Sequence, residues 1–172
     1  CVPDTPYAIR NPYRNLSYPV KTLIEKGLAV DMFFPPDKEH IDHYTKLGAK
    51  CRGFVGFFVL LDEMSKAKYA LAYYPHLRSN TNEHNQITYG MFNKIFDGLA
   101  SGCVLIGIKG TTSGDFIEQH KVGVAVEDML EFQPLLDAEY EGYRQNVLQV
   151  RNQFSMDNEV QKLITMYQLL VS

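Results

Sequence analysis

The sequence contains no tryptophan, only three cysteines in 172 residues, and no long apolar run. A membrane-spanning helix needs roughly 20 consecutive apolar residues, and no stretch of the chain approaches that length. The chain also does not open with a basic and then apolar segment of the kind that directs secretion. These absences predict a soluble domain in the cytoplasm, and they leave peripheral membrane association of the full protein open.

The chain likewise lacks an excess of positive charge. It has 17 Lys and Arg residues against 20 Asp and Glu residues, which is a formal net charge of −3. Surfaces that bind nucleic acid are strongly basic, because they neutralise phosphates. We therefore expect no nucleic-acid partner.

A recognisable metal-binding pattern is missing as well. The cysteines are scattered and odd in number, which favours a reducing compartment, and Cys103 opens an apolar run where a thiol behaves as a small hydrophobic side chain. His40 and His43 lie three residues apart among acidic residues, a spacing that metal ligands use on a helix. Lys38 in the same cluster would repel a cation, so we expect no bound metal.

The arrangement of apolar segments predicts the fold class. Short apolar runs alternate with amphipathic segments of helical length, the pattern of a parallel sheet covered by helices on both faces. We expect an α/β fold with a Rossmann-like, doubly wound sheet of about six strands, in a single domain that spans residues 1–172. The expected strands are residues 6–9, 29–34, 51–55, 69–73, 103–108 and 123–126. The expected helices are residues 18–26, 37–47, 60–66, 91–100 and 115–120, followed by two long helices at the C-terminal end.

Two apolar stripes mark those C-terminal helices. Between them lies Ser155, a capping residue that indicates the start of the second helix. We expect both stripes to pack in the core. The first stripe comprises Leu135, Leu136, Tyr140, Tyr143, Val147 and Val150, and the second comprises Val160, Leu163, Ile164, Tyr167 and Leu170.

Ligands of open α/β sheets bind beyond the carboxyl ends of the strands, and this rule selects three segments. Residues 76–88 are mostly polar and have no predicted helix or strand, as is typical of functional or mobile loops. Residues 90–97 begin a helix at Gly90, and a helix N-terminus attracts anions. Residues 110–114 are small, so their backbone amides would approach a phosphate closely. The G-x-G-x-x-G fingerprint of dinucleotide binding is absent after the first strand.

The helix at residues 91–100 carries a polar stripe opposite its apolar face. The stripe consists of Asn93, Lys94 and Asp97 and continues to Ser101. Lys94 and Asp97 are three residues apart and therefore neighbours on the helix surface. Two interpretations stay open at this point: a solvated face with an ordinary exposed ion pair, or a ligand-binding stripe.

The sequence NKIFDGLASG at residues 93–102, followed by an apolar strand, closely resembles a segment of the GT-B glycosyltransferases. Their nucleotide-sugar domain has the pattern N-K-(L/I)-F-(E/D)-x-L-A-x-G before a short strand. The similarity continues through residues 110–126, where the family has G-G-x-x-E-I-I-x-x-x-x-x-G-x-x-V. Asp115 stands at its glutamate and Gly123 at its last glycine. The resemblance covers roughly residues 51–130.

This resemblance implies the C-terminal domain of a two-domain, cytoplasmic glycosyltransferase. Such a domain binds an activated nucleotide-sugar donor, here a UDP-sugar, for transfer to a glycan or lipid-linked acceptor. The acceptor site and the general base would lie on a separate N-terminal domain, so the domain alone would bind without turnover. The resemblance further implies retention of anomeric configuration, and no metal or cofactor beside the donor substrate.

The resemblance also implies roles for individual residues. Asp97 would accept hydrogen bonds from both ribose hydroxyls, which a carboxylate can do with its two oxygens. Lys94 would face the diphosphate. The remaining donor-binding candidates are Asn93, Gly90, Gly110, Thr111 and Thr112, together with Arg10 and Arg14 near the position of the family's phosphate clamp.

The sequence departs from the family pattern in two places. Tyr89 stands where many members carry a second glutamate, eight residues before the ribose acid, so contacts to the sugar are expected from elsewhere, such as residues 76–88. Asn15 stands where the family often has the lysine of its clamp. The competing hypothesis is a non-catalytic α/β binding or protein-interaction module whose polar stripe simply faces solvent.

Overall fold

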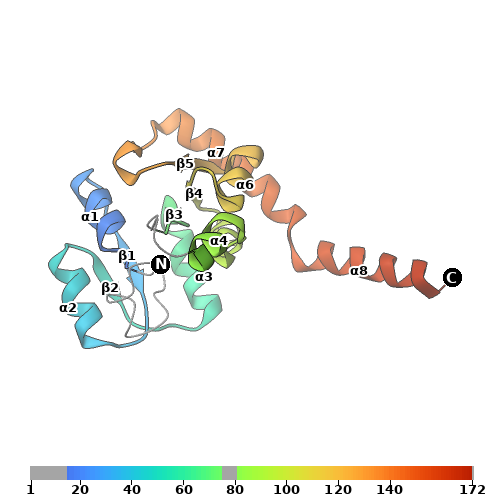
Figure 1. The fold of residues 1–172 in the computed structure, drawn as a ribbon, viewed down its shortest axis with the longest axis horizontal. Coiled ribbons are helices and arrows are strands. Elements are labelled where there is room, and N and C mark those ends of the chain that lie inside the picture. Colours follow the sequence, from blue (N-terminus) through green and yellow to red (C-terminus); the bar gives the residue numbers. More distant parts are fainter. Residues whose placement is uncertain (1–14, 75–80, 172) are drawn as a thin grey trace.

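The computed structural model describes residues 15–74 and 81–171, and these form an α/β fold (Figure 1). The described strands are β1 (Asp31–Phe33), β2 (Lys50–Arg52), β3 (Tyr69–Leu71), β4 (Val104–Ile108) and β5 (Gly123–Val126). The described helices are α1 (Ser17–Glu25), α2 (Lys38–Lys46), α3 (Phe57–Ser65), α4 (Thr81–Tyr89), α5 (Asn93–Ala100), α6 (Thr112–His120), α7 (Asp137–Gln153) and α8 (Met156–Val171), with a 3-10 helix η1 (Met129–Glu131).

The described strands form two small parallel sheets. One contains β1 and β2, with Met32 opposite Cys51, and the other has the order β3-β4-β5, with Leu105 opposite Gly123. The parallel α/β class is therefore confirmed. Five of the six expected strands are present, most of them shorter than expected, while the strand expected at residues 6–9 lies outside the described residues.

Helices cover both faces of the three-stranded sheet. Every residue of β4 is buried, as expected for a parallel strand enclosed on two sides. Leu105 belongs to an apolar cluster with residues of α5, α6 and α7, whereas Ile106 belongs to a second cluster with residues of α1, α4 and η1. Successive side chains of a strand point to opposite faces, so these two helix groups lie on opposite sides of the sheet. A third cluster joins α1 and α2 to β1.

The expectation that residues 76–88 contain no helix was wrong for residues 81–88, because α4 begins at Thr81 and continues to Tyr89. Among the side chains described in this helix, only Ile87 is buried. The sequence of this helix, TNEHNQITY, has no recurring apolar stripe for a periodicity argument to detect. Its position comes instead from tertiary contact with α6, including a hydrogen bond of 3.2 Å from the Thr112 hydroxyl to the Thr88 carbonyl.

The two C-terminal stripes have different outcomes. The first stripe is buried in part: the side chains of Tyr140, Val147 and Val150 are buried as expected, whereas Leu136 is 73% exposed. The second helix begins after Ser155, whose hydroxyl accepts the Asn158 N–H at 3.4 Å, so that expected boundary is confirmed.

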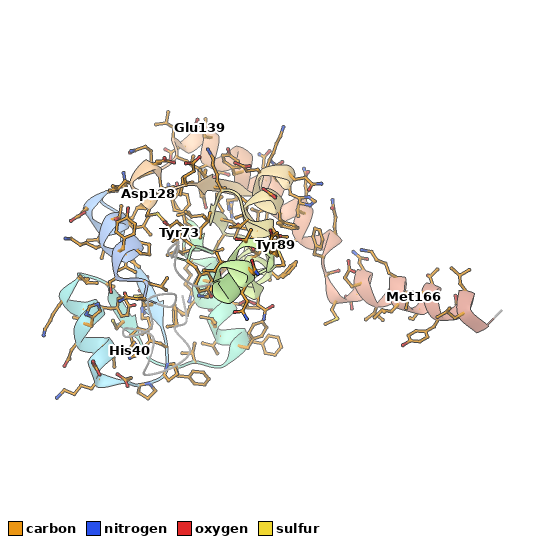
Figure 2. All side chains as sticks on the ribbon, viewed as in Figure 1. His40, Tyr73, Tyr89, Asp128, Glu139 and Met166 are labelled. Atoms are coloured by element: carbon orange, nitrogen blue, oxygen red, sulfur yellow. The ribbon has the colours of Figure 1, made fainter. Side chains whose placement is uncertain are left out.

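The expectation that α8 packs in the core was wrong. Leu163 is 51% exposed and Tyr167 is 64% exposed, and the helix extends away from the remainder of the molecule (Figure 1). Met166, labelled on α8 in Figure 2, lies far from the other labelled residues. An amphipathic pattern shows that a face can be covered, but it does not show that the same chain covers it. None of the helices in the described ranges is long and apolar enough to cross a bilayer.

Candidate functional site

The start of α5 and the start of α6 are held together by one buried hydroxyl. Ser113, which is 1% exposed, accepts the backbone N–H of Phe92 at 3.2 Å and donates to the carbonyl of Gly90 at 3.1 Å. Phe92 is the N-cap residue of α5 and has no side-chain cap of its own. Two of the segments selected from the sequence, residues 90–97 and 110–114, are therefore brought together, and their helix N-termini are neighbours.

A glycine brings α5 close to the sheet. A Cβ atom on Gly98 would lie 2.5 Å from Cδ2 of Leu105 and 3.0 Å from Cβ of Ala70, which is closer than van der Waals contact. The helix can therefore approach β3 and β4 only because position 98 has no side chain. This close packing fixes the polar stripe of α5 relative to the strand ends.

The polar stripe lines a cavity of about 830 Å³. Asn93 is exposed there, while Lys94 and Asp97 are half-buried. The cavity is also lined by residues of α1, α3, β1, β2 and β3, among them Asp31 and Arg52, which form an ion pair at 2.8 Å. The structure thus brings three of the expected donor-binding residues to one cavity.

Lys94 and Asp97 do not form the exposed ion pair considered from the sequence, since no pairing within 4.0 Å joins these two side chains. The ammonium group of Lys94 lies instead over the ring of Tyr74, 4.6 Å from its centroid. Within the described residues, no hydrogen bond or ion pair engages the Asp97 carboxyl group. Burial raises the pKa of Asp97 above its ordinary value, and the nearby charge of Lys94 offsets part of that rise.

The donor-binding candidates that follow β4 differ in whether they are free to contact a ligand. Thr111 is 1% exposed, and its hydroxyl caps α6 by accepting the Gly114 N–H at 2.9 Å while donating to the Ile108 carbonyl at 2.8 Å. Its side chain is therefore occupied by the helix start. Gly110 and Thr112 are exposed, and Gly110 adopts a φ of 69°, which favours glycine.

Two other expectations from the sequence change in the structure. Gly90 ends α4, because its N–H bonds to the Gln86 carbonyl at 2.9 Å and a Cβ atom would lie 2.3 Å from that oxygen; it does not line the cavity. Ser101, placed on the polar stripe from the sequence, is buried. Tyr89, labelled in Figure 2, is exposed at the end of α4. Arg10 and Arg14 lie outside the described residues.

Sequence reasoning did not identify Tyr74 or Ser113. Tyr74 follows β3 at the carboxyl end of a parallel strand, where ligand-contacting residues collect, and that position was the available signal. The role of Ser113 had no local signal, because its partners Gly90 and Phe92 are more than 20 residues away in sequence.

His40 and His43 lie on the same helix, but their side chains contact different partners. Nδ1 of His40 lies 3.0 Å from a carboxyl oxygen of Asp37, while Nε2 of His43 lies 2.6 Å from the Ser17 hydroxyl. Among the residues that the structure describes, no three His, Cys, Asp or Glu side chains are grouped so that they could hold a metal ion. The absence of a metal requirement stays a prediction.

Comparisons of this chain with protein-family models, with curated proteins and with solved structures found no match.

Proposed function

We propose that this chain is the nucleotide-sugar-binding domain of a GT-B glycosyltransferase and that it binds the nucleoside diphosphate of a UDP-sugar beside α5. The observation that carries the proposal is the state of Asp97. Its carboxyl group is half-buried, has a raised pKa, and lines a cavity without a partner among the described residues. Burying an unpaired carboxylate is unfavourable, and groups perturbed in this way concentrate at functional sites.

The chemistry of the stripe fits a ribose diphosphate. A carboxylate at Asp97 accepts hydrogen bonds from two neighbouring hydroxyls, which would repay its desolvation. Lys94 supplies a positive charge one helical turn toward the N-terminus of α5, and the neighbouring N-termini of α5 and α6 carry positive dipole ends. Together these groups would stabilise the charge that develops on the diphosphate as the bond to the sugar breaks.

The same proposal includes parts that lie outside this domain. The acceptor site and the general base belong to a separate N-terminal domain, and the exposed apolar face of α8 would contact that domain. A continuous, doubly wound sheet of about six strands is the framework that the proposal requires. The reaction retains configuration and uses no cofactor beyond the donor.

The direct test is to titrate the protein with UDP, GDP and ADP and to monitor binding through the chemical shifts of its backbone amides. We expect UDP to perturb residues 90–97 and 110–115. Asp97→Ala should weaken binding by about 1.5 to 3 kcal/mol, the range for hydrogen bonds to a charged group, and Asp157→Asn on α8 serves as the matched control. Absence of any shift in both segments at millimolar nucleotide would remove the basis of the proposal. Equal affinity for 2′,3′-dideoxy nucleotides would exclude the ribose contact.

The absence of a metal requirement is tested in the same titration. Fixed donors can balance the charge of a diphosphate in place of a divalent cation, so affinity should change little when EDTA is added. A loss of tenfold or more, about 1.4 kcal/mol, that manganese or magnesium restores would overturn the metal-independent mechanism.

One observation favours the second candidate, a non-catalytic interaction module. Phe54, Phe57 and Phe58 are exposed around the start of α3, in addition to the apolar face of α8. Contiguous exposed apolar surface marks sites of protein contact. This candidate predicts no specific response to any nucleotide, so the titration described above separates the two.

A further inference from the structure

The ion pair of Asp31 and Arg52 lies on the face of the two-stranded sheet that is turned to the cavity. Asp31 begins β1, and Arg52 ends β2 opposite Phe33. Side chains two residues apart on a strand share a face, so Asp31 and Phe33 extend from the same side as Arg52, and all three line the cavity. The residues between them, Met32 and Cys51, pack with apolar residues of α1 and α2 on the other face.

The pairing uses only part of the hydrogen-bonding capacity of the two groups. Nε–H of Arg52 donates to Oδ1 of Asp31 at 2.8 Å. A guanidinium has five N–H donors and a carboxylate has two acceptor oxygens, and within the described residues no other hydrogen bond or ion pair engages either side chain. Arg52 is 37% exposed and Asp31 is 41% exposed. The two NH₂ groups of Arg52 and Oδ2 of Asp31 are therefore available to a ligand in the cavity.

The charges of this pair decide which part of a nucleotide it suits. Asp31 neutralises the charge of Arg52, and its carboxylate would repel a diphosphate. The ammonium group of Lys94 lies instead over the neutral ring of Tyr74, so it keeps a full charge for the diphosphate. The ion pair offers donors and an acceptor side by side without net charge. Its complement is a neutral group that accepts one hydrogen bond and donates another.

We infer that Asp31 and Arg52 read the uracil base of the donor nucleotide, an inference that rests on the proposed function. Uracil has a carbonyl oxygen at C4 beside the N3–H group. The oxygen accepts from an NH₂ group of Arg52, and N3–H donates to Oδ2 of Asp31. Cytosine carries an NH₂ donor at C4 and an unprotonated N3, so it would set donor against donor and acceptor against acceptor. The pair therefore selects UDP over CDP.

The apolar lining of the cavity suits the two faces of a base. Phe33 of β1 and both Leu60 and Met64 of α3 line it. Every base has a π-face that stacks on aromatic rings, and small-molecule sites combine apolar walls with a few polar groups that fix orientation. The cavity of about 830 Å³ also lies within the range of about 300 to 1,000 Å³ for such sites. The walls would hold the base while the ion pair selects it.

Calorimetric titration with UDP and CDP tests the inference, because the two nucleotides have the same size and differ only at the base edge. We expect UDP to bind at least about fivefold more tightly, the lower end of the discrimination that a bidentate base contact provides. Arg52→Met removes the donors and should bring the two affinities within about twofold of each other. Arg144→Met is the matched control, because Arg144 is ion-paired with Glu141 on α7 and does not line the cavity. It should keep the preference.

Amide chemical shifts separate this inference from the proposed function. UDP should perturb Asp31 and Arg52 together with residues 90–97, whereas ribose 5-phosphate, which has no base, should perturb residues 90–97 alone. Equal affinity for UDP and CDP with shifts at residues 90–97, or a preference that survives Arg52→Met, would overturn the base contact and leave the proposed function standing. Absence of shifts at residues 90–97 and 110–115 with either nucleotide would overturn both. If Arg52→Met fails to fold, the titrations of the unaltered chain decide.

Discussion

The ammonium group of Lys94 lies over the ring of Tyr74, 4.6 Å from the ring centroid, and this contact joins α5 to the end of β3. The ring of Tyr74 in turn packs against Phe92, with 4.6 Å between centroids. A contact of this kind orients a cation without neutralising it, because the ring carries no net charge. Lys94 therefore keeps its charge available for an anion in the cavity.

Replacing Tyr74 should weaken binding of UDP through the position of Lys94. A cation-π contact contributes about 0.5 to 1 kcal/mol, so Tyr74→Leu should lower the affinity roughly twofold to fivefold, while Tyr74→Phe should retain it because the ring remains. Calorimetric titration of both variants measures this difference. Equal losses in the two variants would show that the hydroxyl group, and not the ring, is the important feature.

Asp97 should reduce stability at neutral pH while it supports binding. Because burial raises its pKa, the folded state holds the proton more tightly than the unfolded state. The free energy of unfolding therefore falls as the pH rises from the ordinary carboxyl pKa through the raised folded value. Asp97→Asn removes this dependence, so the variant should melt at a higher temperature than the original chain at pH 7.

The control for this prediction is the same comparison of melting temperatures at acidic pH. Below about pH 3 the carboxyl group is protonated in both states, and the advantage of Asp97→Asn should vanish there. Thermal unfolding at several pH values, combined with UDP titration, tests whether one substitution stabilises the fold and weakens the site. A lower melting temperature for Asp97→Asn at pH 7 would indicate a structural role instead.

Two buried serines offer a matched pair. Ser113→Ala leaves the Phe92 N–H and the Gly90 carbonyl without their partner, and an unsatisfied buried group costs about 1 to 3 kcal/mol. Ser101 is also buried, but its hydroxyl has no partner among the described residues, so Ser101→Ala should be neutral or stabilising. Chemical denaturation of both variants measures the contrast, and similar losses would contradict it.

A second pair concerns glycines in helices. Gly98→Ala places a Cβ atom 2.5 Å from Leu105, and overpacking of this kind typically costs about 1 to 3 kcal/mol. Gly142 lies in α7 with no atom within 4 Å of a built Cβ, so Gly142→Ala should stabilise the protein by about 0.4 to 1 kcal/mol. Denaturation midpoints test both signs. A neutral Gly98→Ala would show that α5 can move away from the sheet.

Local patterns predicted the elements but only part of the site. The run before β4 identified α5, its polar stripe and the following strand, because helical spacing and an apolar strand are visible in the sequence. The same patterns did not show that Thr111 caps α6 or that Gly90 ends α4. Those roles depend on which backbone group lies nearby, and small residues in a loop have the same composition whether they face a ligand or their own backbone.

The sequence by itself determined the α/β class, the start of α8 after Ser155 and the burial of β4, because capping chemistry and apolar composition act over a few neighbouring residues. Only the tertiary structure decided that α8 projects from the body, that α4 is a helix, and that Ser113 joins α5 to α6. Each of these depends on partners distant in the chain or on the absence of a covering element. Long-range packing selects among the arrangements that local propensity permits, since one amphipathic face or one buried hydroxyl is compatible with many neighbours.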